Sequence, residues 1–483
     1  MVLSGKKLAE VKTWHKLNME TLQRTANRGS VSTGPYQIDN SLKFEPDNSE
    51  YIYRTPSSAG NRRTWTLSFW LKRTELGASM RIFEAWDGST GTSALFTDAD
   101  LFILDLNAGS NYFTSSGAFR DTAAWYHFVI RVDTTSGTAS ERARVYVNGS
   151  ELAGSWNYNI GQNTDLTWNE DVAHAFARFH NGDSYVSAYY AEIINVDGTS
   201  LAPTAFGEVD SASGIWKPID ASPTYGTNGF KLEFKTAGGL GADTSGNGHT
   251  FTLNAIAAAD QATDTPTNNF CTLNPLVNFK YGTNIGGMTN GATVFGDNTG
   301  GGVGGAFGTM AVTAGKWYWE VKLTQQVQHY IGISAIADGG DVLASSDPQD
   351  INSSFNFNIS AARIEYHENG SKVNGSTDAF SDFHTVGDII GIALNMDDNQ
   401  ISIYGNGTLQ VGVANTSIFD AANKMVVPFH GTINDECQYN FGGYSVWTPS
   451  SVQNDENGYG TFEYSPPSGY YALCTQNLAL YGG

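Results

Sequence analysis

Residues 65–72, with the sequence WTLSFWLK, decide the fold of this chain. Every second residue from Trp65 to Leu71 is apolar, and such alternation places these side chains on one face of a β-strand. Residues 125–132, with the sequence WYHFVIRV, repeat the pattern from Tyr126 onwards. Two stretches of this kind predict a sheet with one face turned towards a core.

The turns between the predicted strands are short and rich in glycine and asparagine. Residues 144–147 run directly into the Asn-Gly pair at 148–149, which favours a tight β-hairpin. Residues 189–196 form another alternating stretch, closed by the Asp-Gly pair at 197–198. No helical periodicity intervenes between these strands, and this arrangement is typical of an antiparallel β-sandwich.

The composition changes at residues 257–278, where small and polar residues are interrupted by Pro266 and Pro275. Beyond this boundary, residues 317–323 and 390–396 alternate again. We therefore predict an all-β protein with two tandem antiparallel β-sandwiches (jelly rolls) after a short N-terminal helical arm. Its five parts are a partly helical docking arm (1–35), a first sandwich (36–260), a linker (261–279), a second sandwich (280–448) and an ordered C-terminal tail (449–483).

The N-terminal segment differs from the rest of the chain because its apolar residues recur at helical spacing. Basic residues outnumber acidic ones over residues 1–28, although the whole chain carries a formal net charge of −21. A basic amphipathic helix on an acidic protein favours docking to an acidic partner; packing on its own domain is the alternative. The candidate docking residues are Leu8, Val11, Lys12, Trp14, Lys16 and Leu22.

The charge and composition exclude several classes of function. The excess of 48 acidic over 27 basic residues argues against a nucleic-acid partner and against anionic membrane surfaces. The N-terminus lacks a signal-peptide core and no membrane-spanning apolar run occurs, so we expect synthesis and assembly in a cytoplasm. Cys271, Cys437 and Cys474 are far apart and odd in number, which predicts free thiols.

Motifs for catalysis and metal binding are weak. No strand carries the alternating acidic residues that a glycan hydrolase on a jelly roll would need, so we predict no enzymatic activity. His174 and His180 lack a third ligand at a natural spacing, and we assign no metal site. The turns at Asp183 and Asp243 could hold calcium through oxygen atoms, but such turns are common without metal. No residue is assigned to calcium and no other cofactor is expected.

Aromatic residues flanked by amides in loops are the candidates for carbohydrate contact, because pyranose rings have an apolar face. One group lies in the loop run 155–169, and a further tryptophan precedes the Asp-Gly pair at 87–88. Alternatively, these rings cap the edges of the sandwich or fill an interface between subunits. The glycan-contact candidates are Trp86, Trp156, Tyr158 and Trp168.

The first sandwich resembles the laminin-G-like and concanavalin A-like jelly rolls over residues 40–255. The order and spacing of four motifs carry this resemblance. They are WTLSFWLKR (65–73), AWYHFVIRVD (124–133), RVYVNG (144–149) and YYAEIINVDG (189–198). One departure is ADTSGNGHTF (242–251), which resembles a motif usually found near the start of such domains and here suggests a rearranged closing strand.

The second sandwich resembles the SPRY family, a twisted β-sandwich used mainly for partner recognition. The resemblance covers residues 280–445, and its motifs follow the order of the family. They are GKWYWEVKL (315–323), YIGIS (330–334), GDIIGIALNMDDNQISIYGNG (387–407), VVPFHG (426–431) and YNFG (439–442).

The tandem as a whole, with TPTNNFCTLNPL (265–276) and GYYALCTQNL (469–478), resembles virion appendage proteins of tailed phages from aquatic bacteria. This resemblance implies a structural protein of the virion surface, of the tail-fibre or spike type, that displays carbohydrate-binding-like sandwiches for host attachment. A capsid-decoration or head-fibre protein is one alternative, and a polysaccharide depolymerase is a second. The expected partners are further copies in a trimer, other virion proteins through the N-terminal arm, and host-surface glycans.

Overall fold

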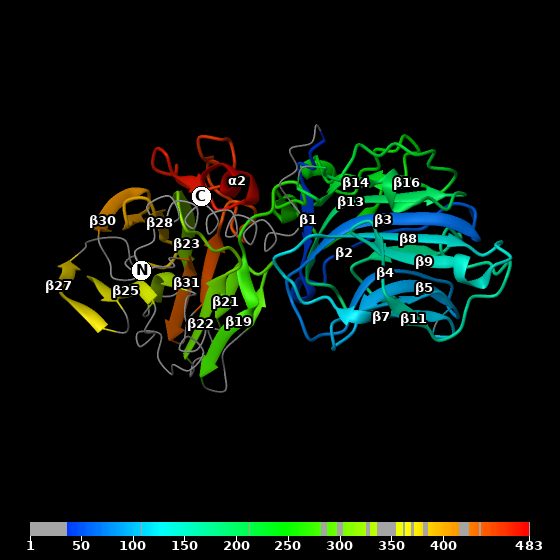
Figure 1. Ribbon diagram of the computed structural model, residues 1–483, viewed down its shortest axis with the longest axis horizontal. Coiled ribbons are helices and arrows are strands. Elements are labelled where there is room, and N and C mark those ends of the chain that lie inside the picture. Colours follow the sequence, from blue (N-terminus) through cyan, green and yellow to red (C-terminus); the bar gives the residue numbers. More distant parts are fainter. Residues whose placement is uncertain are drawn as a thin grey trace, which may run out of the picture.

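The computed structural model of the chain is almost entirely β, and its two sandwiches lie side by side (Figure 1). The predicted all-β fold with two tandem antiparallel β-sandwiches is thereby confirmed. The arm at residues 1–35, with all its candidate docking residues, lies outside the described residues. The structure describes residues 36–107, 109–211, 213–281, 287–296, 303–324, 329–335, 354–360, 363–368, 371–379, 385–414, 425–433 and 436–482.

The first sandwich consists of two packed antiparallel sheets. Sheet A contains, in order, β10 (Ser150–Glu151), β9 (Ala143–Val147), β8 (Tyr126–Asp133), β3 (Thr64–Arg73), β13 (Ala188–Asp197), β1 (Ser41–Phe44) and β18 (Gln261–Ala262), with β16 (Phe230–Leu232) also paired to β13. Sheet B contains β11 (Gly154–Trp156), β7 (Tyr112–Ala118), β6 (Leu101–Asp105), β5 (Gly91–Phe96), β4 (Met80–Trp86), β12 (Ala173–Phe176), β2 (Tyr51–Arg54) and β17 (Thr252–Asn254).

The central strand β3 explains why the decisive stretch folds as it does. Its alternating residues Trp65, Leu67, Phe69 and Leu71 are all fully buried in the core between the two sheets. Each apolar side chain buried in this way stabilises the fold by about 1.5–3 kcal/mol. The opposite face of β3 is covered as well, because its residues from Thr66 to Lys72 are also buried. Sheet A therefore has no solvent-facing side at β3.

The second sandwich also has two sheets. Sheet F contains β19 (Leu273–Tyr281), β22 (Val303–Gly308), β31 (Val426–Ile433), β24 (His329–Ala335), β25 (Ser354–Ser360), β26 (Arg363–Glu368) and β27 (Ser371–Ala379). Sheet G contains β20 (Met288–Thr289), β21 (Val294–Gly296), β32 (Glu436–Asn440), β23 (Lys316–Leu323), β28 (Ile389–Asn395), β29 (Gln400–Gly405) and β30 (Thr408–Ala414).

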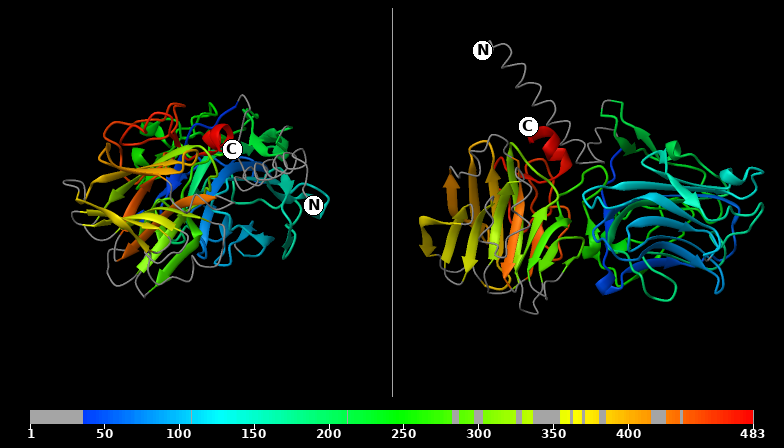
Figure 2. Two further views of the ribbon diagram at one scale, coloured as in Figure 1. Left: turned by 60° about the vertical axis from the view of Figure 1, so that its left-hand side comes forward. Right: turned by 60° about the horizontal axis from the view of Figure 1, so that its bottom comes forward.

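The segment after the second sandwich folds back onto it. β33 (Tyr471–Ala472) pairs in parallel with β23, and α2 (Thr475–Tyr481) follows directly. The buried carboxylate of Glu320 on β23 accepts the backbone N–H groups of Glu463 and Tyr464 at 2.9 and 2.8 Å. Figure 2 shows α2 close to the boundary between the two sandwiches.

Short elements complete the described parts of the chain. The hairpin of β14 (Gly207–Val209) and β15 (Trp216–Pro218) packs against sheet A, where the ring of Trp216 lies over Gly149. The single-turn helices are η1 (Pro46–Asn48), η2 (Ala139–Glu141), η3 (Pro203–Ala205), η4 (Ala237–Gly239) and η5 (Ala258–Asp260).

Candidate functional site

Three loops of the first sandwich meet at one end of the strands of sheet B. The pairing of Trp86 with Gly91 places the β4–β5 turn at this end, and the pairing of Asp105 with Tyr112 places the β6–β7 turn beside it. Trp156 pairs with Phe113 on the neighbouring strand, so the loop after β11 leaves from the same end. These three loops, which we call the rim of sheet B, include both sequence regions that carry the aromatic candidates.

Tyr158 is the most exposed of the aromatic candidates, with 72% of its surface accessible. The backbone below it is held in place by amides. Asn157 accepts the N–H groups of Tyr112 and Tyr158 at 2.7 and 2.8 Å and donates to the carbonyl of Ser110 at 3.2 Å. Asn111 donates to the carbonyl of Tyr158 at 3.3 Å. The ring thus stands on an ordered loop, which lowers the entropy lost when a ligand binds.

Trp156 and Trp168 both pack against the core of the first sandwich. Trp156 is half-buried and packs on Phe113, with ring centres 5.6 Å apart, so it caps the edge of the core. Trp168 is 0% exposed, its indole N–H bonds to Asn195 at 2.9 Å, and its ring meets Phe83 edge-on. A fully buried ring cannot touch a glycan, so the prediction for Trp168 was wrong.

Trp86 is half-buried and already stacked. Its indole lies parallel to the imidazole of His180, with ring centres 4.1 Å apart and an angle of 4° between the planes. The indole also lies against Gly91, where a Cβ would approach its Cε3 to 2.7 Å. His180 therefore covers one face of the indole. No sequence pattern indicates this role for His180, because the residue comes from a loop far along the chain.

The carboxylates near this rim serve as acceptors for backbone groups. Glu84 is buried and accepts the N–H of His180 at 2.6 Å. Burial raises the pKa of Glu84, and the Arg81 guanidinium and the bonds from His180 oppose this rise. Burial also raises the pKa of Asp105, which accepts the N–H groups of Asn107 and Gly109. Each carboxylate thus accepts hydrogen bonds from the backbone of a nearby loop, and these bonds order that loop.

The two predicted histidines serve separate purposes. His174 is buried, which lowers its pKa to about 4, and its Nε2 accepts the N–H of Asn169 at 2.9 Å. Its Nδ1 therefore donates to the carbonyl of Val172. His180 stacks on Trp86 instead. Within the described part of the chain, no three His, Cys, Asp or Glu residues are arranged to hold a metal ion.

The calcium candidates form ordered turns. Asp243 accepts four bonds, from the N–H groups of Lys231, Ser245 and His249 and from the hydroxyl of Ser245, at 2.8 to 2.9 Å. Asn247 donates from its amide to two backbone carbonyls. The oxygens of Asp243 thus accept the hydrogen bonds that order the closing turn. Such hydrogen bonding is the usual role of Asp and Asn in turns.

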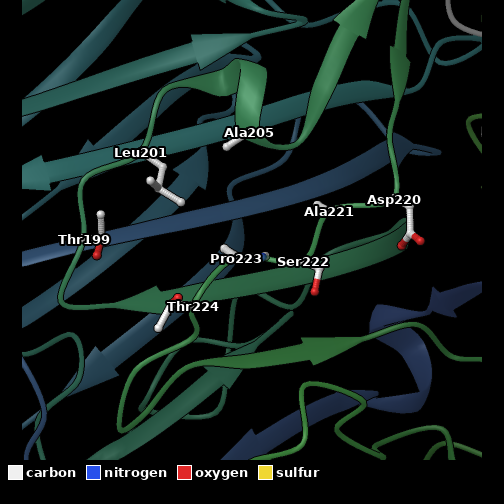
Figure 3. Close-up of a pocket in the computed structure, with 8 residues that line it drawn as sticks. All are labelled: Thr199, Leu201, Ala205, Asp220, Ala221, Ser222, Pro223 and Thr224. Carbon is white, nitrogen blue, oxygen red and sulfur yellow. The ribbon is translucent and has the colours of Figure 1, made fainter.

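A shallow cavity of about 400 Å³ lies elsewhere on the first sandwich, beside sheet A (Figure 3). It contains a single carboxylate, Asp220, among hydroxyl and aliphatic groups. It therefore lacks the acid pair that glycan hydrolysis needs. Its lining residues are Thr199, Leu201, Ala205, Asp220, Ala221, Ser222, Pro223 and Thr224.

Comparison with protein families agrees with the two sandwiches. Residues 46–193 match the concanavalin A-like lectin/glucanases superfamily, and residues 316–444 match the SPRY domain. The chain carries a concanavalin A-like domain and a SPRY domain. The lectin-type fold supports a binding function for the first of these domains. No curated protein matches the chain. Among the described residues, no helix has the length and apolarity to span a membrane.

Several solved structures match the chain at low sequence identity. A candidate carbohydrate-binding protein from Bacteroides ovatus is 17% identical over 46% of this chain and 59% of its own length, with a TM-score of 0.34. The SPRY domain of human HERC1 is 19% identical over 29% of this chain and 83% of its own, with a TM-score of 0.22. Domains LG4-5 of the mouse laminin α1 chain are 10% identical over 92% and 90%, with a TM-score of 0.28.

Proposed function

We propose that this chain is a structural protein of the virion surface of a tailed bacteriophage, of the tail-fibre or spike type. In this proposal, the concanavalin A-like domain contacts host-surface glycans through the rim of sheet B, and the SPRY domain contributes a second binding module. The virion role is supported by the resemblance of the tandem and its linking segments to phage appendage proteins. The glycan role is supported by the rim itself.

The observation that carries the glycan role is the exposed ring of Tyr158 on a loop that amide side chains fix. Carbohydrate sites combine an exposed aromatic face with amide and carboxylate groups that bond to hydroxyls. Asn111 and Asn157 place such groups beside Tyr158. A single contact of this kind is weak, so the proposal includes a trimer in which several rims act together and gain affinity through avidity.

Oligosaccharide-array binding tests the glycan role. The wild-type chain should bind a subset of bacterial surface glycans, and Tyr158→Ala should lower that binding at least tenfold. Tyr53→Ala is the matched control, because Tyr53 is an accessible tyrosine (38% exposed) on β2, away from the rim. Equal loss in both variants, or no binding by the wild type, would refute this role.

Particle experiments test the virion role. Labelled antibody against the chain should mark the tail of the particle, and deletion of residues 1–28 should abolish incorporation while both sandwiches stay folded. Label on the capsid would favour the head-decoration alternative. Loss of polysaccharide viscosity on incubation with the protein would favour the depolymerase alternative. Normal incorporation without residues 1–28 would remove the docking role of the arm.

A further inference from the structure

Lys72 on β3 has an unusual set of neighbours. Its ammonium group is buried on the outer face of sheet A, with a side chain that is 0% exposed. Its Nζ lies 2.7 Å from Oδ2 of Asp264 and 2.7 Å from Oδ1 of Asn269. It also donates to the carbonyl of Phe270 at 3.0 Å. An amine, a carboxylate and a carboxamide are thus in direct contact, and both acceptor side chains come from the linker.

Aromatic groups enclose this cluster and fix its orientation. The indole N–H of Trp125 bonds to the second oxygen of Asp264 at 3.0 Å. The amide nitrogen of Asn269 donates to the carbonyl of Ala123 at 2.6 Å, which turns the amide oxygen towards Lys72. Tyr189, fully buried, lies opposite Lys72 on the neighbouring strand. Water is therefore excluded, and the side chains of Lys72, Asp264 and Asn269 are held in contact.

We propose that Lys72 and Asn269 condense into an intramolecular isopeptide bond, with Asp264 as the proton carrier. Asp264 takes a proton from the Lys72 ammonium, and the free amine attacks Cγ of Asn269. The new bond joins Nζ to Cγ, and Asp264 returns its proton to Nδ2 as the Cγ–Nδ2 bond breaks and ammonia leaves. The ammonia takes the remaining proton from the new amide nitrogen. Overall, one ammonium side chain and one carboxamide become one secondary amide and one ammonium ion, so atoms and charge balance. No oxidant or cofactor takes part.

Other buried lysines show what a purely ionic arrangement looks like. Lys43 lies 3.1 Å from Glu50 and 3.0 Å from Asp260. Lys231 lies 3.1 Å from Glu192, with further carboxylates beyond it. In both cases the close partners are carboxylates that serve as counter-ions. At Lys72 the carboxamide adds an acylating group at the same distance as the carboxylate, and this addition separates a reactive cluster from an ion pair.

The bond would fasten the central strand of the first sandwich to the linker. Residue 269 lies just before β19, so the cross-link would anchor the point at which the chain enters the second sandwich. The chain has three cysteines, which are buried, and among the described residues none of them forms a disulfide. An isopeptide bond needs no oxidising compartment, unlike a disulfide. The inference is independent of the proposed binding function.

Mass spectrometry of the full-length, denatured wild-type protein tests the proposal directly. The intact mass should be lower than the sequence mass by one ammonia molecule. Tandem spectra of a tryptic digest should contain a branched peptide that joins Lys72 to Asn269. An intact mass equal to the sequence mass would overturn the proposal. Loss of water with a branch from Lys72 to Asp264 would also overturn it.

Variants separate the bond from other sources of ammonia loss, such as succinimide formation at an Asn-Gly pair. Lys72→Met and Asn269→Ala should each restore the full sequence mass. Lys43→Met, a matched control at another buried lysine, should keep the ammonia loss. Persistent ammonia loss in Lys72→Met would overturn the assignment. The wild-type spectrum decides the question even where a variant fails to fold.

Discussion

The hydroxyl of Tyr189 donates a hydrogen bond to the backbone carbonyl of Gly291 at 3.0 Å, and so joins the first sandwich to the second. The ring of Tyr444, from the segment after β32, packs edge-on against Tyr189 with ring centres 5.9 Å apart. The ammonium group of Lys43 lies 5.4 Å from the centre of the same Tyr444 ring. The N–H of Asn290 also bonds to the buried carboxylate of Glu45. The two sandwiches therefore share a packed, polar interface.

The first prediction concerns this interface. Tyr444→Ala removes a ring that is in contact with Tyr189 and Lys43, and truncation of a buried aromatic ring costs about 3–5 kcal/mol. Calorimetry should show one cooperative unfolding transition for the wild type and two for Tyr444→Ala. Tyr158→Ala, on the distant rim, should keep a single transition. Two well-separated transitions in the wild type would mean that the interface does not couple the sandwiches.

The second prediction concerns Gly291, which has a φ of +69°. A Cβ at this position would lie 2.1 Å from the hydroxyl of Tyr189. Gly291→Ala therefore combines left-handed strain of about 1–2 kcal/mol with an overpacking cost of about 1–3 kcal/mol. Gly248→Ala is the control, since Gly248 has a φ of +75° but no atom within 4 Å of its Cβ position. Chemical denaturation should show the larger loss for Gly291→Ala, and Tyr189→Phe in the same chain should recover part of it.

The third prediction separates the two kinds of aromatic residue. Trp168→Ala should lower the free energy of unfolding by about 3–5 kcal/mol, because it leaves a cavity in the core and an unpaired Asn195 amide oxygen. Tyr158→Ala should change it by less than about 0.5 kcal/mol, as expected for an exposed side chain. Urea denaturation of both variants measures the difference. Similar losses in the two variants would show that Tyr158 is packed in solution.

The fourth prediction follows from the buried carboxylate of Glu320. Burial raises its pKa to about 7, and the bonds from Glu463 and Tyr464 only partly oppose this. The pKa in the folded state lies above the ordinary value of 4.5. Folding therefore takes up a proton between these two pH values. The resulting stability is fully present below pH of about 4.5 and is lost as the pH rises through about 7.

Glu320→Gln should reduce this pH dependence. Between pH of about 4.5 and 7, the slope of unfolding free energy against pH should fall by at most the contribution of one bound proton. It should not vanish, because burial also raises the pKa of Glu45 to about 7. Urea denaturation over this range measures the slope, with Glu151→Gln on exposed β10 as the control. An unchanged slope in Glu320→Gln would contradict the prediction.

The fold was predictable because strand periodicity is a local property. Trp65 and its partners at every second position in β3 reach the core whatever the rest of the chain does, and the Asn-Gly pair after β9 forms the expected hairpin. The burial of both faces of β3 could not be predicted in this way. At Lys72 it depends on the linker residue Asp264, which lies far away in sequence and is placed only by the tertiary fold.

The candidate site was only partly predictable for the same reason. Composition alone treated Tyr158 and Trp168 as equivalent aromatic residues in one loop. Leu166 and Trp168 are buried in the same core cluster, so that part of the loop packs inside the sandwich. Asn157 instead holds Tyr158 at the rim. The stacking of His180 on Trp86 brings the loop after β12 onto the end of β4. No local sequence pattern marks such a contact.

The contact between α2 and the linker sets an order of events during synthesis. The hydroxyl of Thr475 accepts the N–H of Asn269, which is 206 positions earlier in the chain, and the backbone N–H of Gln476 bonds to the side chain of Asn268. While a ribosome is still translating the SPRY domain, these linker groups have no α2 to meet. The hydrogen bonds between the linker and α2 can therefore form only after α2 has emerged from the exit tunnel.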